Sequence, residues 1–229
     1  MIYCMPVDLG QSQDYTVASL IQRREAFQKR EGLPGSYEYE RSPTISFQAY
    51  DIRDMWRPPL KTAYVQVVDD IQKRLQHPRL KERCSLVVDA TGAGRPVIEL
   101  MWERKMNPIG IIITGGHQIT IDKDGFYHVP KKELVSTIQL MFESGRLRVA
   151  DFTLASAFRE ELLAFTRKMT KAGNDTYEAF VESAHDDMVM SVAMGLWYME
   201  SLYGPSNIMK HPEAKKRAEA SDDLRYGLS

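Results

Sequence analysis

Residues 85–96 of the chain read SLVVDATGAGRP, a short run with β-branched residues that leads into an acid and a glycine-spaced turn. From Pro96 to Met101 the pattern is helical, so the sequence predicts a strand, a turn and a helix. Asp89 ends the predicted strand, where α/β sheets place the crevice in which ligands bind. A single acid at this place would equally suit a turn or a helix cap. Other acids at strand ends would favour a functional site.

The composition is that of a soluble globular protein, with 43% hydrophobic and 27% charged residues among 229. A net charge of −1 gives no overall attraction to nucleic acid, so DNA binding would need a local basic patch. No apolar run reaches membrane-spanning length and the N-terminus lacks a signal-peptide pattern, so we expect a cytoplasmic protein. Cys4 and Cys84 are expected to be reduced thiols that hold no zinc.

The hydrophobic patterns predict one α/β domain over residues 1–204 and a flexible polar tail over residues 205–229. Strands are expected at 2–9, 15–22, 44–52, 85–90, 109–114 and 146–149, with a hairpin at 119–129. Helices are expected at 63–75, 96–105, 131–144, 153–169 and 184–203. The charged segment 23–42 is interpreted as a mobile excursion and 171–175 as a loop or hairpin tip. This order predicts a mixed sheet flanked by helices.

Acids recur where the first and fourth strands end, at Asp8 and Asp89, and where the last helix begins, at Asp186 and Asp187. This strand order sets the first and fourth strands side by side, and the last helix brings a further carboxylate to the same end. Clustered carboxylates repel one another unless hard cations such as Mg²⁺ or Mn²⁺ neutralise them. Two such ions about 4 Å apart would support phosphodiester hydrolysis. An acid in the first helical turn also favours the helix dipole, so one of Asp186 and Asp187 is expected to serve the helix alone.

Six motifs together resemble the C-terminal nuclease domain of tailed-bacteriophage large terminases, over residues 2–203. They are VDLG at 7–10 with Asp14 beyond it, VDATGAGRPV at 88–97, ITGG at 113–116, VPKKELV at 129–135, SGRL at 144–147 and HDDMV at 185–189. The resemblance implies an RNase H-like fold and two-metal cleavage of concatemeric double-stranded viral DNA in the host bacterial cytoplasm. A packaging ATPase domain, a small terminase and a portal protein are the implied partners.

Carried over residue by residue, the resemblance makes Asp8, Asp89 and Asp187 the catalytic ligands of two Mg²⁺ or Mn²⁺ ions. Asp186 and Asp14 are alternative or auxiliary ligands, and which of Asp186 and Asp187 points inward is left open. His185 is auxiliary, and is interpreted as a hydrogen-bonding residue at the helix start because hard cations do not favour imidazole.

One departure from the family is that the chain contains no Gly-x-x-x-x-Gly-Lys-[Ser/Thr] phosphate loop and has no room for a packaging ATPase. We therefore expect no ATP hydrolysis, and the chain is either an excised domain or a natural separate one. The spacing of Gly92 and Gly94 does not complete a dinucleotide-binding loop, because Val97 replaces the third glycine.

DNA contacts require several cations on one face, since phosphate binding is electrostatic. The candidates are Lys131, Lys132, Arg146, Arg148, Arg167, Lys168 and Lys171. No base-reading motif is present, so we expect cleavage with little sequence preference. A Holliday-junction-resolvase-like nuclease and a non-catalytic DNA-binding module of a packaging motor are the alternative functions.

Overall fold

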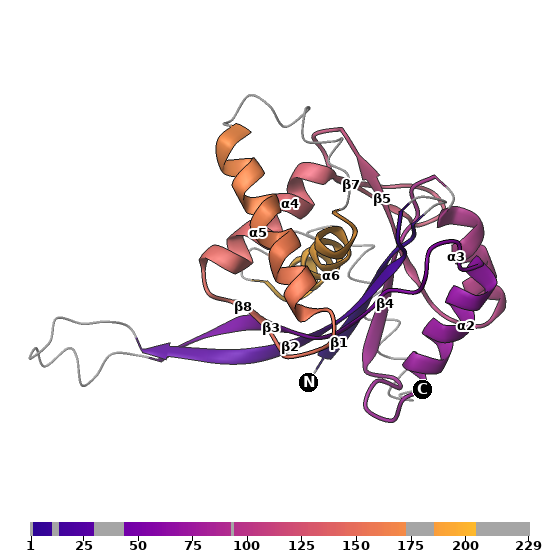
Figure 1. Cartoon of the computed structure of the whole chain (residues 1–229), viewed down its shortest axis with the longest axis horizontal. Coiled ribbons are helices and arrows are strands. Elements are labelled where there is room, and N and C mark those ends of the chain that lie inside the picture. The colour runs from indigo at the N-terminus through magenta and orange to yellow at the C-terminus, as the bar shows by residue number, and fades with distance from the viewer. Residues whose placement is uncertain (1, 11–13, 30–43, 93, 173–185, 205–229) are drawn as a thin grey trace, which may run out of the picture.

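A mixed β-sheet organises the chain (Figure 1). The computed structural model describes residues 2–10, 14–29, 44–92, 94–172 and 186–204. Within them, eight strands form one sheet in the order β6-β7-β5-β4-β1-β2-β3-β8. The strands are β1 (Ile2–Asp8), β2 (Val17–Lys29), β3 (Thr44–Trp56), β4 (Cys84–Asp89), β5 (Ile109–Thr114), β6 (Thr120–Ile121), β7 (Tyr127–Pro130) and β8 (Leu147–Val149). The helices are α2 (Tyr64–Leu75), α3 (Gly94–Glu103), α4 (Lys131–Glu143), α5 (Ala155–Ala172) and α6 (Asp187–Tyr203).

The strand pairing combines an antiparallel and a parallel part. Strands β1, β2 and β3 pair antiparallel in chain order. Strand β4 then pairs parallel with the other edge of β1, and β5 and β7 continue the parallel part. The predicted RNase H-like fold class, with three antiparallel strands followed by parallel strands, is confirmed.

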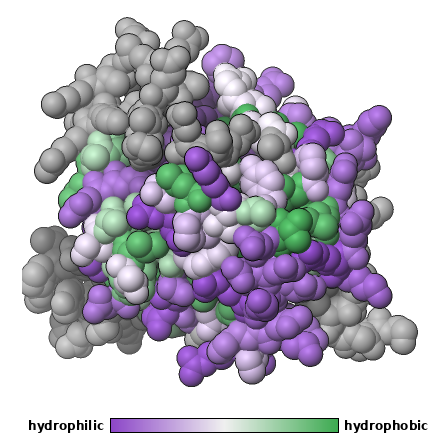
Figure 2. All heavy atoms as spheres, turned by 45° about the vertical axis from the view of Figure 1, so that its right-hand side comes forward, coloured by the Kyte–Doolittle hydropathy of each residue, from purple (hydrophilic) through white to green (hydrophobic). Residues whose placement is uncertain are grey.

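Helices cover both faces of the sheet and enclose two hydrophobic cores (Figure 1). Helices α4, α5 and α6 lie on one face, and α2 and α3 on the other. Successive strand residues point to opposite faces. In β4, accordingly, Val87 packs in the core beneath α6, whereas Leu86 and Val88 pack beneath α2 and α3. On the α2–α3 side, Figure 2 shows a mainly hydrophilic surface with separate hydrophobic patches.

Among the helices that the structure describes, α6 is the most buried, and it packs on β1 and β2. Its side chains from Met188 to Ser201 are all buried. Gly195 allows the close approach, because a Cβ atom there would lie 2.7 Å from both Ile21 Cδ1 and Pro6 Cγ. Ser191 adds polar contacts, since its hydroxyl donates to the Pro6 carbonyl at 3.1 Å and lies 2.9 Å from the Ser19 hydroxyl. These contacts set the position of α6 over the first two strands.

The prediction for the charged segment after residue 22 was wrong up to Lys29. Strand β2 continues to Lys29 and pairs with an equally long β3, which the sequence had ended at residue 52. The charges are accommodated because they pair across the strands. Arg24 Nε lies 3.0 Å from Asp51 Oδ1, and Arg23 donates to the Gln48 side chain at 3.0 Å.

Two further boundaries differ from the prediction. Helix α5 continues to Ala172, so the predicted loop does not begin at Lys171. Helix α6 begins at Asp187. The remainder of the predicted excursion, the rest of the loop to residue 175, His185 and the tail at 205–229 lie outside the described residues. No helix in the described ranges combines the length and the hydrophobicity needed to cross a membrane.

Candidate metal centre

Asp8 and Asp89 end neighbouring parallel strands and face the same side of the sheet. The register pairs Val7 of β1 with Val88 of β4, so the next residues along the two strands are Asp8 and Asp89. Val7 and Val88 both belong to the core beneath α2 and α3. By alternation, the two aspartates point to the opposite face, where α6 lies.

The glycine-rich turn after β4 holds Asp89 in place. Its Oδ1 atom accepts a hydrogen bond of 2.8 Å from the Thr91 backbone N–H. The Thr91 hydroxyl in turn accepts the Ile113 N–H of β5 at 2.9 Å, which ties the turn to the sheet. Gly94 begins α3 so close to the strand that a Cβ atom there would lie 2.1 Å from the Asp89 carbonyl oxygen. The segment 85–96, from which the strand, turn and helix were predicted, therefore also orients the candidate metal ligand Asp89.

The start of α6 supplies Asp186 and Asp187. Asp186 occupies the N-cap position, yet its side chain makes no capping hydrogen bond. Its Oδ2 atom instead forms an ion pair of 2.9 Å with Lys131 Nζ at the start of α4. Asp187 Oδ2 accepts the Tyr15 backbone N–H, which precedes β2, at 3.3 Å. Neither hydrogen bond caps the helix that carries these two acids.

The four aspartates are close enough to perturb one another electrostatically. Burial raises the pKa of the Asp8 carboxyl well above its usual range, and the charges of Asp89, Asp187 and Asp186 raise it further, in that order of effect. Lys131 opposes them and lowers this pKa. Burial also raises the pKa of Asp89, against the hydrogen bonds from Thr91. Of the two acids at the start of α6, Asp187 raises the pKa of Asp8 more than Asp186 does.

The donors in this cluster are carboxylate oxygens, the ligands that hard divalent cations prefer. A bound cation would offset the mutual repulsion that raises the pKa of Asp8. Across the described ranges, however, no three His, Cys, Asp or Glu side chains stand arranged as a ready metal-binding group. The four aspartates thus have the right chemistry for a hard cation but are not arranged around one. The carboxylates of Asp89, Asp186 and Asp187 instead accept hydrogen bonds from groups of the protein.

Glu161 of α5 is a further acid at this end of the sheet that the sequence did not reveal. Its Oε1 atom accepts the Val189 N–H at 2.9 Å. The pKa of Glu161 is raised to about 7, chiefly by burial and further by the charges of Asp187 and Asp186, against the hydrogen bond from the Val189 amide. Glu161 stands within an ordinary amphipathic helix, so no motif or strand end marks it.

Asp14 and His185 were the auxiliary candidates for the metal site. Asp14 is exposed in the segment between β1 and β2 and borders a hollow of about 280 Å³, which Gly10 and Tyr64 also line. It is not among the charges that shift the pKa of Asp8. His185 lies outside the described residues.

The basic candidates for DNA contact divide into several environments. Lys131 pairs with Asp186, and Lys132 Nζ lies 3.1 Å from His117 Nδ1 at the surface. Arg148 is exposed on β8. The side chains of the three α5 candidates, Arg167, Lys168 and Lys171, lie outside the described residues.

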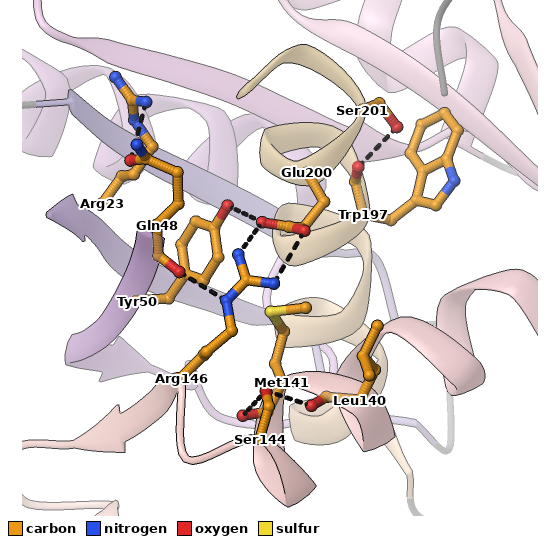
Figure 3. Close-up of polar contacts among 10 residues, drawn as sticks. All are labelled: Arg23, Gln48, Tyr50, Leu140, Met141, Ser144, Arg146, Trp197, Glu200 and Ser201. Atoms are coloured by element: carbon orange, nitrogen blue, oxygen red, sulfur yellow. Dashed lines mark hydrogen bonds and ion pairs between the residues drawn. The ribbon is translucent and has the colours of Figure 1, made fainter. Parts of the chain in front are cut away.

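Arg146 has a structural role that the sequence did not predict (Figure 3). Its guanidinium forms two contacts with Glu200 of α6, at 2.5 and 3.2 Å, and its Nε donates to the Gln48 carbonyl at 2.6 Å. The Tyr50 hydroxyl donates to the same Glu200 carboxylate. The Arg146 side chain is only 12% exposed, and its guanidinium is engaged by this network.

Comparison with known proteins identifies the fold. No protein-family model and no curated protein matches the chain. Two solved structures of the large terminase nuclease from thermophilic phage G20c are similar to it. One is 18% identical, with a TM-score of 0.50 over 88% of this chain and 82% of that chain. The other, with bound zinc, is 20% identical, with a TM-score of 0.48 over 88% of this chain and 81% of that chain. The likeness extends to the fold, as the resemblance in sequence motifs predicted.

Proposed function

We propose that this chain is a divalent-metal-dependent endonuclease that cuts double-stranded DNA during viral genome packaging. The observation that carries the proposal is the meeting of Asp8, Asp89 and Asp187 at one end of the sheet, on the face that α6 covers. The fold shared with the large terminase nuclease of phage G20c supports it. A packaging ATPase, a small terminase and a portal protein are the proposed partners.

Asp8, Asp89 and Asp187 would hold two Mg²⁺ or Mn²⁺ ions through their carboxylate oxygens. When bound, such ions lower the pKa of a water and stabilise the departing oxygen of a phosphodiester. The Thr91 and Tyr15 backbone amides orient Asp89 and Asp187, so these carboxylates are held in place before metal binds.

Lys131 is proposed to act beside the metals. It holds Asp186 at 2.9 Å, and it lowers the pKa of Asp8. Asp186 is accordingly proposed as an auxiliary ligand, and Asp187 as the principal ligand from α6. A cation at this edge also suits contact with a DNA phosphate, for which Lys132, Arg148 and the three basic residues of α5 are further candidates.

Plasmid digestion tests the proposal. The chain is incubated with supercoiled plasmid in Mn²⁺, Mg²⁺ or EDTA, beside Asp8→Ala, Asp89→Ala and the control Asp70→Ala. Asp70 is a more exposed carboxylate on α2, on the opposite face of the sheet. We expect metal-dependent cleavage that falls by about 10³-fold in the two site variants and is unchanged in Asp70→Ala.

Three other outcomes would change the proposal. Cleavage that survives Asp8→Ala and Asp89→Ala would place the active site elsewhere. Cutting of four-way junctions but not of linear duplex would favour a resolvase-like nuclease. DNA binding without cleavage under any metal would favour a DNA-binding module.

A further inference from the structure

The first turn of α6 is capped from another helix. The first backbone N–H groups of a helix have no partner within it, and an N-cap side chain normally accepts the N–H two or three residues on. For α6 the N-cap residue is Asp186, so those amides belong to Met188 and Val189. Asp186 does not accept them, because its carboxylate pairs with Lys131.

Glu161 takes the place of the missing cap. Its Oε1 atom accepts the Val189 N–H at 2.9 Å, which is the N–H three residues after the N-cap. The carboxylate reaches this amide from α5, which packs against α6 through the buried Phe158 and Leu162. Glu161 therefore provides, from α5, the hydrogen-bond acceptor that a side chain at the N-cap of α6 would otherwise provide.

We propose that Glu161 is a positioning residue that caps α6 from α5 and thereby leaves the carboxylates of Asp186 and Asp187 available to the metal centre. This rests on the proposed function, because it assigns the two aspartates to metal binding. Without Glu161, Asp186 is the nearest acid in sequence able to accept the freed amide. Turning inward to do so, it would leave Lys131 and pull the start of α6 away from Asp8 and Asp89.

Metal binding without DNA separates this role from a direct ligand. The affinity for Mn²⁺ is measured by titration calorimetry in the wild type, Glu161→Ala and Glu161→Gln, and the melting temperature of each is measured in EDTA. Glutamine keeps the acceptor oxygen and removes the charge. We expect Glu161→Ala to weaken Mn²⁺ binding by about 10- to 100-fold, as loss of a residue that orients ligands does, and Glu161→Gln to stay within about threefold of the wild type.

Two control variants on α5 complete the design. Glu160→Ala removes the exposed neighbouring carboxylate and should leave Mn²⁺ binding unchanged. Leu162→Ala removes a buried side chain that contributes nothing to the cap, so it should lower the melting temperature at least as much as Glu161→Ala while Mn²⁺ affinity is kept. Amide exchange adds a structural readout, since the Val189 N–H should exchange faster in Glu161→Ala alone.

The inference is overturned if Glu161→Ala binds Mn²⁺ as the wild type does. It is also overturned if Glu161→Gln is as damaging as Glu161→Ala, which would make Glu161 a ligand. If Leu162→Ala weakens Mn²⁺ binding as much as Glu161→Ala does, the effect of Glu161→Ala reflects lost stability alone, and the inference is again overturned. Asp8→Ala in the same titration distinguishes the two proposals. Wild-type binding that is lost in Asp8→Ala supports the metal centre whatever Glu161 does, and absence of wild-type binding overturns both.

Discussion

The two ends of α6 both carry acids, and they differ in how the negative charge is compensated. Near the C-terminal end, the buried Glu200 receives two contacts from Arg146 and a hydrogen bond from the Tyr50 hydroxyl (Figure 3). At the N-terminal end, Asp186 and Asp187 meet Asp8 and Asp89, and their charges raise the pKa of Asp8. Lys131 offsets part of this repulsion.

This difference separates a structural acid from a candidate ligand. Arg146 and Tyr50 satisfy Glu200 within the protein, so its charge needs nothing from solution. At the other end, closely placed carboxylates depend on protons or on a cation to relieve their repulsion. The protein therefore uses one helix both to close its core and to assemble a site for a positively charged ligand.

Removing the cation that compensates Glu200, near the C-terminal end of α6, should have the largest effect on stability. Arg146→Ala leaves the Glu200 carboxylate buried without its cation, and we expect the free energy of unfolding to fall by about 3 kcal/mol. Urea denaturation measures it, with the exposed Arg148→Ala as control and an expected change within about 0.5 kcal/mol. A loss for Arg146→Ala no larger than that of the control would show that the network does not stabilise the fold.

Removing one negative charge from the aspartates at the N-terminal end of α6 should instead raise the free energy of unfolding. In EDTA at neutral pH, Asp8→Asn removes a repelled charge, and we expect the free energy of unfolding to rise by on the order of 1 kcal/mol. Because the folded-state pKa of Asp8 is raised, the wild type regains this stability as the pH falls, and the difference closes towards the ordinary aspartate pKa. Denaturation between pH 4 and 7 measures it. A destabilised Asp8→Asn would mean that the carboxylate is compensated as it stands.

The smallest effect on stability is expected at Asp122, an acid near the surface whose negative charge is also compensated by the protein. Burial acts to raise its pKa, but hydrogen bonds from the Phe126 amide, His128 and the Asp124 amide, with the Arg95 charge, lower it overall. Asp122→Asn should therefore cost about 0.5 kcal/mol at neutral pH, and the cost should vanish as the pH falls through the lowered pKa. The same denaturation series measures it, and a gain in stability at neutral pH would contradict the assignment.

Local pattern was sufficient to predict the central part of the fold. Short apolar runs ending at Asp8 and Asp89 marked β1 and β4, and the strand order placed them side by side. The prediction failed in the segment after residue 22, because its charges resemble a solvated loop. The partners that make Arg23 and Arg24 compatible with a strand, Gln48 and Asp51, lie on the other arm of the hairpin.

The sequence by itself determined which elements form and where acids end them, because strand alternation, helical periodicity and glycine turns are local properties of the chain. Only the tertiary structure decided how each charge is used. Arg146, predicted to contact DNA, pairs with Glu200, which lies 54 residues away in the chain. Glu161, which no motif marks, caps a helix that begins 26 residues later, at Asp187. Charge compensation and helix capping depend on distances in space, and the packing of α5 and α6 sets those distances.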